Sequence, residues 1–479
     1  MRQRNRPYVV RFCLAALLLP CSVYAQPSLN GFWTGTMTRD GATQEISLRI
    51  SGNTDGYKAN FDWPDSGYFH EDAISIKVRD RDVLVSLPMP RGALKLTGTW
   101  EGDSVSGGLL EIGNVAGAWK TIHTDGSFRL SRASAPTLPY RMEEVSFNDS
   151  TVTLAGSLLI PRGAGRHPAM TFLHGGGDET RGDGMFIGDK LARRGIVVLI
   201  YDKRGNGKST GEWRQGGFEE LADDGAAALR VLLARPDVDA KRTGFVCYSQ
   251  GCWIAPLAIS RGAPAQFLVS ISGPTVTVED EGFAQYANRV REAGMPNSEL
   301  AKALPLLKLD NSVSKGQASW SDLQAQIAKD KDQPWYKAIN WSPEDMNDPE
   351  RRFYGKILTY DPKAYIESLK IPSLWFFGSA DITIPAQASW ERLRGMSVSP
   401  KPWIVIMENA DHAMTVREGG KLPALAHGFP GMMVDWIYTG RGRPLSGKKP
   451  AEGNDCSWPK PAVREQRSLS DPRRPGGCS

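Results

Sequence analysis

The sequence predicts an α/β protein, in which a mostly parallel sheet is covered by helices on both faces and is preceded by a small all-β domain. Two observations support this fold class. From about residue 140, buried strand-like runs alternate with amphipathic helix-like runs, which is the pattern of a parallel sheet with crossover helices. Before that, residues 27–135 contain only short alternating runs separated by Gly, Asp and Asn, which is typical of a small barrel or sandwich.

Residues 1–25 have the features of a secretory signal peptide. The basic residues Arg2, Arg4, Arg6 and Arg11 precede or begin an apolar run, and small residues end the segment at Ala25. The apolar run is too short to span a bilayer. We therefore expect export to the periplasm or the medium, with cleavage near Ala25.

Composition narrows the range of partners. Four of the 58 basic residues leave with the signal peptide, so 54 basic residues stand against 53 acidic ones and no nucleic-acid partner is predicted. No later run is long and apolar enough to predict a membrane span. Six scattered histidines without HExxH or CxxC spacing predict neither a metal nor a cofactor. The oligomeric state is left open.

The all-β domain shows no convincing catalytic cluster. A role in packing and solubility is the simpler interpretation, and binding of a carbohydrate or an apolar ligand stays open. Its expected strands recur about every ten residues, at 31–38, 44–50, 57–63, 74–78, 83–87, 94–100, 104–110, 116–122 and 128–130.

Residues 140–440 form the α/β domain, and residues 275–365 interrupt it with helical spacing alone. We interpret this interruption as an inserted helical cap. From residue 441 to 479 the chain is rich in Pro and Gly without periodicity, which predicts a flexible tail. The expected core strands lie at 144–147, 152–159, 169–173, 196–201, 244–247, 267–271, 372–377 and 403–407.

The segment Cys247-Tyr248-Ser249-Gln250-Gly251 lies between a strand-like and a helix-like run. This is the layout of a nucleophile elbow, which lifts a serine hydroxyl out of the sheet. Cys247 replaces the first glycine of the usual G-x-S-x-G motif. Buried thiols are the simpler interpretation of Cys247 and Cys252, and a local disulfide stays open. Pairing of Cys456 and Cys478 is equally undetermined.

Three further segments follow strands of the predicted sheet. Glycines Gly175 and Gly176 succeed one strand, where their backbone N–H groups could approach an oxyanion. Asp381 follows a later strand and is placed to orient a histidine. His412 follows the next strand and suits general acid–base work because the imidazole pKa is near neutrality.

The order of Ser249, Asp381 and His412, each after a strand, resembles the α/β-hydrolase family over roughly residues 140–440. The resemblance is strongest to exported bacterial serine esterases related to dienelactone hydrolases and prolyl-oligopeptidase-like hydrolases. The loop at 201–211 is similar to the D-x-R-G-x-G-x-S-x-G loop of that group. The likeness implies an α/β-hydrolase fold with a helical cap. It also implies a catalytic triad and an oxyanion hole made by the N–H groups of Gln250 and of Gly175 or Gly176.

These residues predict a serine hydrolase that cleaves carboxylic esters of small to medium size through an acyl-enzyme. An aminopeptidase or acyltransferase on the same core stays open, as does a binding protein with a decayed core. We expect the substrate pocket to lie between the sheet edge and the inserted helices. Their aromatic residues are candidates for its lining: Phe283, Tyr286, Trp320, Trp335 and Trp341.

Overall fold

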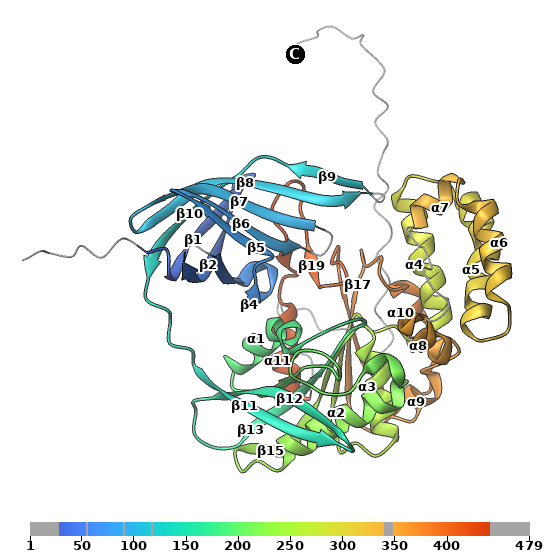
Figure 1. Cartoon of the computed structure of the whole chain (residues 1–479). Coiled ribbons are helices and arrows are strands. Elements are labelled where there is room, and N and C mark those ends of the chain that lie inside the picture. The colour runs from blue at the N-terminus through green and yellow to red at the C-terminus, as the bar shows by residue number, and fades with distance from the viewer. Residues whose placement is uncertain (1–27, 54–55, 90–91, 116–117, 340–347, 441–479) are drawn as a thin grey trace, which may run out of the picture.

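The computed structural model describes residues 28–53, 56–89, 92–115, 118–339 and 348–440. Figure 1 shows three parts, which are an N-terminal β-domain, an α/β core and a group of helices beside the core. The expected signal peptide, the tail with Cys456 and Cys478, and Trp341 lie outside the described residues.

The β-domain is a single antiparallel sheet. Its strands are β1 (Gly31–Arg39), β2 (Ala42–Asn53), β3 (Gly56–Trp63), β4 (Tyr68–Asp72), β5 (Ser75–Arg79), β6 (Asp82–Met89), β7 (Gly92–Glu101), β8 (Ser104–Val115), β9 (Ala118–His123) and β10 (Ser127–Ala133), with the short helix η1 (Pro64–Ser66) before β4. They pair in the order β4-β3-β2-β1-β10-β8-β7-β6-β5, and β9 extends β8. Because β5 also packs near β3, the sheet curls into a barrel-like shape around Trp33, Phe61 and Trp63.

The α/β core is built on an eight-stranded sheet. Its strands are β11 (Tyr140–Asp149), β12 (Val152–Pro161), β13 (His167–Leu173), β14 (Val197–Tyr201), β15 (Val238–Tyr248), β16 (Leu268–Ile271), β17 (Ser373–Gly378) and β18 (Trp403–Met407). The order is β11-β12-β14-β13-β15-β16-β17-β18. The β11–β12 hairpin pairs antiparallel to β14, and all later strands are parallel.

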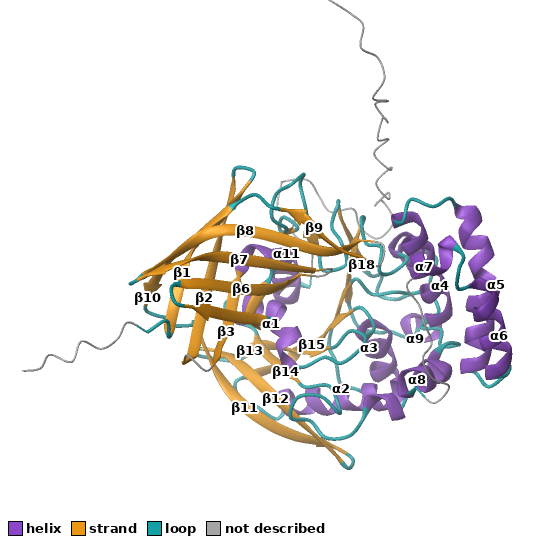
Figure 2. Cartoon of the chain, turned by 45° about the horizontal axis from the view of Figure 1, so that its top comes forward, coloured by secondary structure: helices purple, strands orange, loops and turns teal. Residues whose placement is uncertain are grey.

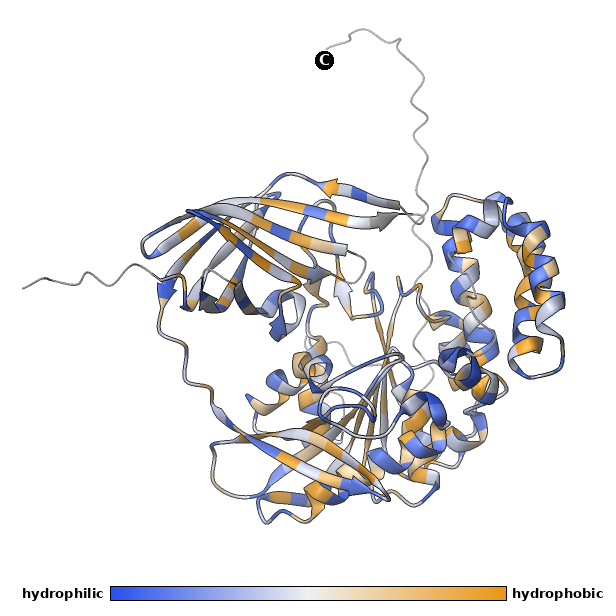
Figure 3. Ribbon diagram, in the orientation of Figure 1, coloured by the Kyte–Doolittle hydropathy of each residue, from blue (hydrophilic) through white to orange (hydrophobic). Residues whose placement is uncertain are grey.

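Helices cover both faces of this sheet. Along β14, Val197 and Leu199 join one core cluster, whereas Val198 and Ile200 join the other, because side chains alternate along a strand. The first cluster contains α2 (Phe218–Leu233), α3 (Gly251–Ser260), α9 (Lys363–Glu367) and α10 (Ala386–Arg394). The second contains α1 (Met185–Ala192) and α11 (Phe429–Thr439). Figure 3 shows the apolar residues concentrated in the central strands.

The cap is inserted between β16 and β17 and is helical throughout its described residues (Figure 2). It has a core of its own, formed around Val290, Leu306, Leu323 and Trp335. Its helices are α4 (Val278–Glu292), α5 (Asn297–Ser314), α6 (Trp320–Asp330), α7 (Pro334–Ile339) and α8 (Pro349–Ile357). Among the helices described, none is long and apolar enough to cross a membrane.

The β-domain is docked on the α/β core by the segment that follows β18. This segment contains the small hairpin of β19 (Thr415–Val416) and β20 (Ala424–Leu425). Leu422, between them, lies in the core of the β-domain and is 2% exposed. The Gln44 side-chain amide donates to the carbonyl oxygen of Pro423 at 3.2 Å. The loop after β18 therefore contributes a side chain to the apolar core of the β-domain.

We predict that Leu422→Ala lowers the free energy of unfolding by about 2–4 kcal/mol, because the change leaves a cavity in the core of the β-domain. Urea denaturation measures the loss. Ile74→Ala is the matched control, since Ile74 is 59% exposed on the same domain and its truncation should change stability by less than about 0.5 kcal/mol. Equal effects of the two substitutions would contradict the docking role of Leu422.

Candidate active site

Ser249 lies in the turn between β15 and α3 and adopts a φ of 49°. Residues other than glycine rarely adopt this left-handed conformation because their Cβ crowds the backbone, so the turn stores strain. The Ser249 N–H donates to the Ile271 carbonyl at 3.1 Å, which fastens the turn to β16. At position 251 only glycine fits, since a Cβ would lie 2.4 Å from the Leu173 carbonyl oxygen. The geometry is that of a nucleophile elbow.

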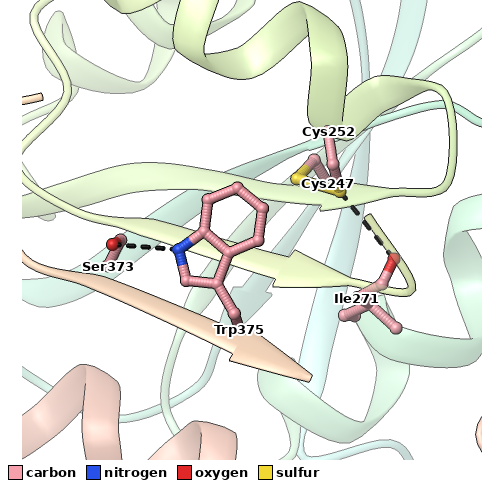
Figure 4. The surroundings of a disulfide bond; sticks show 5 residues. All are labelled: Cys247, Cys252, Ile271, Ser373 and Trp375. Atoms are coloured by element: carbon pink, nitrogen blue, oxygen red, sulfur yellow. Dashed lines mark hydrogen bonds between the residues drawn. A yellow bond between two sulfur atoms is a disulfide. The ribbon is translucent and has the colours of Figure 1, made fainter. Parts of the chain in front are cut away.

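A disulfide joins Cys247 to Cys252 across this turn. Figure 4 shows that it links the end of β15 to the first turn of α3. The interpretation of these residues as two buried thiols was wrong. In the chain-entropy model, closing such a short loop stabilises the fold by about 2 kcal/mol. The bond also explains how a cysteine occupies the position of the first motif glycine, because its side chain is directed into the bond with Cys252.

Asp381 and His412 meet at the carboxyl edge of the sheet. Asp381 follows β17 and His412 follows β18, so neighbouring parallel strands deliver the two side chains to one place. His412 Nδ1 lies 2.8 Å from Asp381 Oδ2. The Asp381 side chain is fully buried, and its second oxygen accepts the N–H groups of Thr383 and Ile384. The carboxylate is therefore held rigidly toward the imidazole.

Asp411 has a different environment. Its Oδ1 accepts the N–H groups of Ala413 and Thr415, and its Oδ2 accepts the Thr415 hydroxyl at 2.7 Å. Asp411 thus folds the loop that carries His412, and Asp381 is the carboxylate that the imidazole contacts. The His412 carbonyl in turn accepts the Ser272 hydroxyl at 2.7 Å.

The three residues expected to form the oxyanion hole lie near one another, but they are not equivalent. Gln250 lies at the start of α3, where backbone N–H groups point out of the helix. Gly176 is exposed. The Gly175 N–H, in contrast, donates to Glu179 Oε2 at 2.8 Å. Gly175 as an oxyanion donor is therefore not supported, because a carboxylate already occupies its N–H, and the candidate donors narrow to Gln250 and Gly176.

Lys203 braces this glycine loop and was not singled out as a site residue from the sequence. Its Nζ donates to the carbonyls of Gly175 and Gly177 and, at 3.2 Å, to Gln250 Oε1. Burial lowers the pKa of Lys203 to about 8, although the nearby Glu179 raises it. The only sequence signal was the motif-like loop at 201–211, whose residues approach the glycine loop from the neighbouring strand.

His174 is a second brace. Its Nε2 lies 2.5 Å from the Tyr201 carbonyl oxygen, and burial lowers the pKa of the imidazole to about 3. The neutral ring therefore holds the start of the glycine loop against the end of β14 and takes no part in proton transfer at neutral pH.

A cavity of about 650 Å³ lies beside these residues, between the α/β core and the β-domain. This volume is in the range of small-molecule sites. The α/β core contributes Tyr248 and Ala413, the direct neighbours of Ser249 and His412, and the cap contributes only Glu292. The expectation of a pocket lined by cap aromatics is wrong for Trp335, which is fully packed in the core of the cap, and Phe283, Tyr286 and Trp320 pack against that same core.

The loop bearing His412 is also clamped to the β-domain by charge. Arg417 donates from two nitrogens to the two carboxylate oxygens of Glu111, at 3.0 and 3.1 Å. Glu111 also accepts from the buried Arg39 at 2.6 Å. Bidentate pairs of this kind fix orientation as well as distance. Because Arg417 is five residues from His412, the β-domain helps to hold the histidine loop in place.

The chain is similar to known proteins over its α/β core. A family model described as serine aminopeptidase, S33, matches residues 166–418, more than half of the chain. Esterase EstD of Thermotoga maritima is 26% identical over 308 residues, which cover 62% of this chain and 67% of the esterase.

Two solved structures also match part of the chain. The Pyrococcus furiosus esterase Pf2001 has 18% identity and a TM-score of 0.39, covering 63% of this chain and 90% of the esterase. A dienelactone hydrolase from Anabaena variabilis has 18% identity and a TM-score of 0.37, covering 63% of this chain and 98% of that protein. The family match and the esterase relative confirm the predicted α/β-hydrolase fold and the prediction of a serine hydrolase of the esterase type.

We predict that Glu71→Gln stabilises the protein at pH 8 but not at pH 5. Glu71 lines the cavity from β4, and burial, followed by the carboxylates of Asp183 and Asp72, raises the pKa of Glu71 from 4.5 to about 7. Between pH 4.5 and about 7 Glu71 keeps its proton in the folded protein, whereas it has lost this proton in the unfolded chain. The free energy of unfolding therefore falls as pH rises through this window. Removing the charge should raise Tm at pH 8 by on the order of 2 °C.

Thermal denaturation at the two pH values measures this effect. Glu101→Gln, at an exposed position of the same domain, is the control and should leave Tm unchanged at both. If Glu71→Gln raises Tm as much at pH 5 as at pH 8, the electrostatic explanation is refuted.

Proposed function

The chain belongs to the serine aminopeptidase S33 family, and we propose that within it this protein is an esterase whose catalytic triad is Ser249, His412 and Asp381. One observation carries the proposal. A serine in the strained elbow conformation and a histidine paired with a buried carboxylate at 2.8 Å lie at the same edge of one parallel sheet. Ligands of open α/β sheets bind at this edge.

In the proposed mechanism His412 takes the proton of the Ser249 hydroxyl as Oγ attacks the ester carbonyl carbon. The negative charge that develops on the carbonyl oxygen is stabilised by the N–H groups of Gln250 and Gly176. The alcohol leaves with the proton from His412, and an acyl-enzyme remains. Water then attacks the acyl-enzyme, giving its proton to His412, and the acid leaves as Ser249 regains its proton.

Asp381 acts through the histidine. Its carboxylate accepts from Nδ1, which fixes Nε2 as the nitrogen that exchanges protons with the substrate, and it stabilises the imidazolium form. The hydrogen bonds to Asp381 from Thr383 and Ile384 keep this carboxylate in place throughout the cycle.

We favour esters over amides as substrates, because the curated relative is an esterase. The proposed substrates are small to medium neutral esters, with the protein acting after export and cleavage near Ala25. Aminopeptidase activity is the second candidate, since the family description names it.

We predict that Ser249→Ala lowers ester turnover by about a million-fold while leaving the fold intact, because the nucleophile is lost. The assay compares p-nitrophenyl esters with aminoacyl p-nitroanilides and monitors labelling by a fluorophosphonate probe. The wild-type protein should be labelled and should prefer the esters. Ser249→Ala should be neither labelled nor active on the esters.

Two results of this assay would redirect the proposal. Efficient anilide cleavage with negligible ester turnover would assign the protein to the aminopeptidases. An unlabelled, inactive wild-type protein would indicate a binding protein with a decayed core.

We also predict that Asp381→Asn loses about ten-thousand-fold in kcat, because an amide that donates toward Nδ1 stabilises the wrong imidazole tautomer. Asp411→Asn is the matched control. It retains the oxygen that accepts two backbone N–H groups, so its loss should be at least a hundred-fold smaller. If Asp411→Asn is the more damaging change, the triad carboxylate has been assigned to the wrong residue.

A further inference from the structure

The β-domain supplies one wall of the cavity beside the candidate active site. Four of its side chains give that wall an apolar character, namely Tyr68, Met89, Ile112 and Ile122. Ile122 is a large apolar residue of this lining and is 39% exposed. It lies on β9, the strand at the free edge beside β8.

Tyr248 connects this wall to the reacting groups. It directly precedes Ser249, and its ring centroid lies 5.1 Å from that of the His412 imidazole. The same side chain lines the cavity, as does Ala413, which directly follows His412. The cavity is thus lined by residues that directly adjoin Ser249 and His412 in the chain.

The cap contributes little to this cavity. Among the described cap residues, only Glu292 at the end of α4 lines it, and Trp335 is packed in the core of the cap. The β-domain, in contrast, contributes residues from the segment around β4 and from β6, β7, β8 and β9. This cavity is thus lined mainly by the β-domain and the α/β core.

Charge in the cavity restricts what it accepts. Six carboxylates line it, together with Arg417, which is paired with Glu111, and His123: Glu71, Glu111, Glu179, Asp183, Glu292 and Asp411. Burial, followed by the carboxylate of Asp183, raises the pKa of both Glu71 and Glu179. A further carboxylate placed there would meet the same repulsion and the same loss of water. The space suits a group that is apolar and carries no negative charge.

We propose that the N-terminal β-domain is the specificity pocket of the esterase and binds an uncharged apolar group of the substrate, with Ile112 limiting the length of that group. This inference rests on the proposed serine-esterase function. It gives the β-domain a role in substrate selection, whereas the sequence favoured one in packing and solubility.

The test is the substitution Ile112→Trp, which fills the cavity in front of Tyr248, with Ile74→Trp as the matched control. Ile74 is an exposed isoleucine of the same domain that does not line the cavity. We expect the ratio of kcat/KM for p-nitrophenyl octanoate to kcat/KM for p-nitrophenyl acetate to fall at least tenfold in Ile112→Trp and to stay unchanged in Ile74→Trp.

A second series identifies which side of the ester enters the cavity. Acetate esters of ethanol, hexanol and octanol keep the acyl group constant, and a length-dependent loss confined to this series would place the alcohol in the cavity. Loss confined to the p-nitrophenyl acyl series would place the acyl group there. Equal losses for all lengths, or none in either series, would overturn the proposal.

A charged substrate tests the exclusion of anionic groups. The p-nitrophenyl monoester of octanedioic acid matches the octanoate in length but ends in a carboxylate. We expect its kcat/KM to be at least tenfold lower than that of the octanoate, and equal values would overturn the exclusion of anionic groups.

Fluorophosphonate labelling separates this proposal from the function on which it rests. If Ile112→Trp is labelled like the wild type but shows no change in selectivity, the specificity role fails and the esterase proposal stands. If the wild type is not labelled, the esterase proposal itself fails. Should Ile112→Trp not fold, Ile122→Trp replaces it, because Ile122 is more exposed and its enlargement strains the sheet less.

Discussion

The loop that follows β18 is the constraint on which the rest of the structure depends. Near its start His412 is paired with Asp381, at Arg417 it is held by Glu111 of the β-domain, and at Leu422 it enters the core of that domain. A shift of the β-domain would therefore pull directly on the loop that carries the histidine. The position of the imidazole, the docking of the domains and the walls of the cavity are set by one stretch of backbone.

The elbow shows how local strain is held in place by its neighbours. Ser249 keeps a positive φ because both sides of the turn are fixed, by the hydrogen bond to β16 and by the Cys247–Cys252 bond to α3. Strained conformations persist only where the surroundings over-determine them. In the usual motif, close packing around a small glycine holds the turn in place. Here the disulfide bond between Cys247 and Cys252 holds it.

Much of the α/β core could be predicted from the sequence, because buried strands, helical spacing and glycine turns are local signals. The same signals located Ser249, Asp381 and His412, since each follows a strand that periodicity reveals. The strand β4, short and polar at Tyr68–Asp72, was missed because it lacks the alternation of an amphipathic strand. Glu179 as the partner of the Gly175 N–H could not be foreseen, because that contact depends on how a loop folds back on itself.

The misplaced pocket has a similar cause. Aromatic residues in the cap are equally compatible with lining a site and with filling a helical core, and sequence spacing does not distinguish the two. The position of the cavity depends on which domain lies beside the carboxyl edge of the sheet. The placement of that domain depends in turn on contacts between residues hundreds of positions apart, such as the hydrogen bond from Gln44 to Pro423. A domain that buries Leu422 in its own core cannot move far from the edge where Ser249 and His412 lie. The β-domain is therefore held beside that edge, where it lines the cavity next to Tyr248 and Ala413.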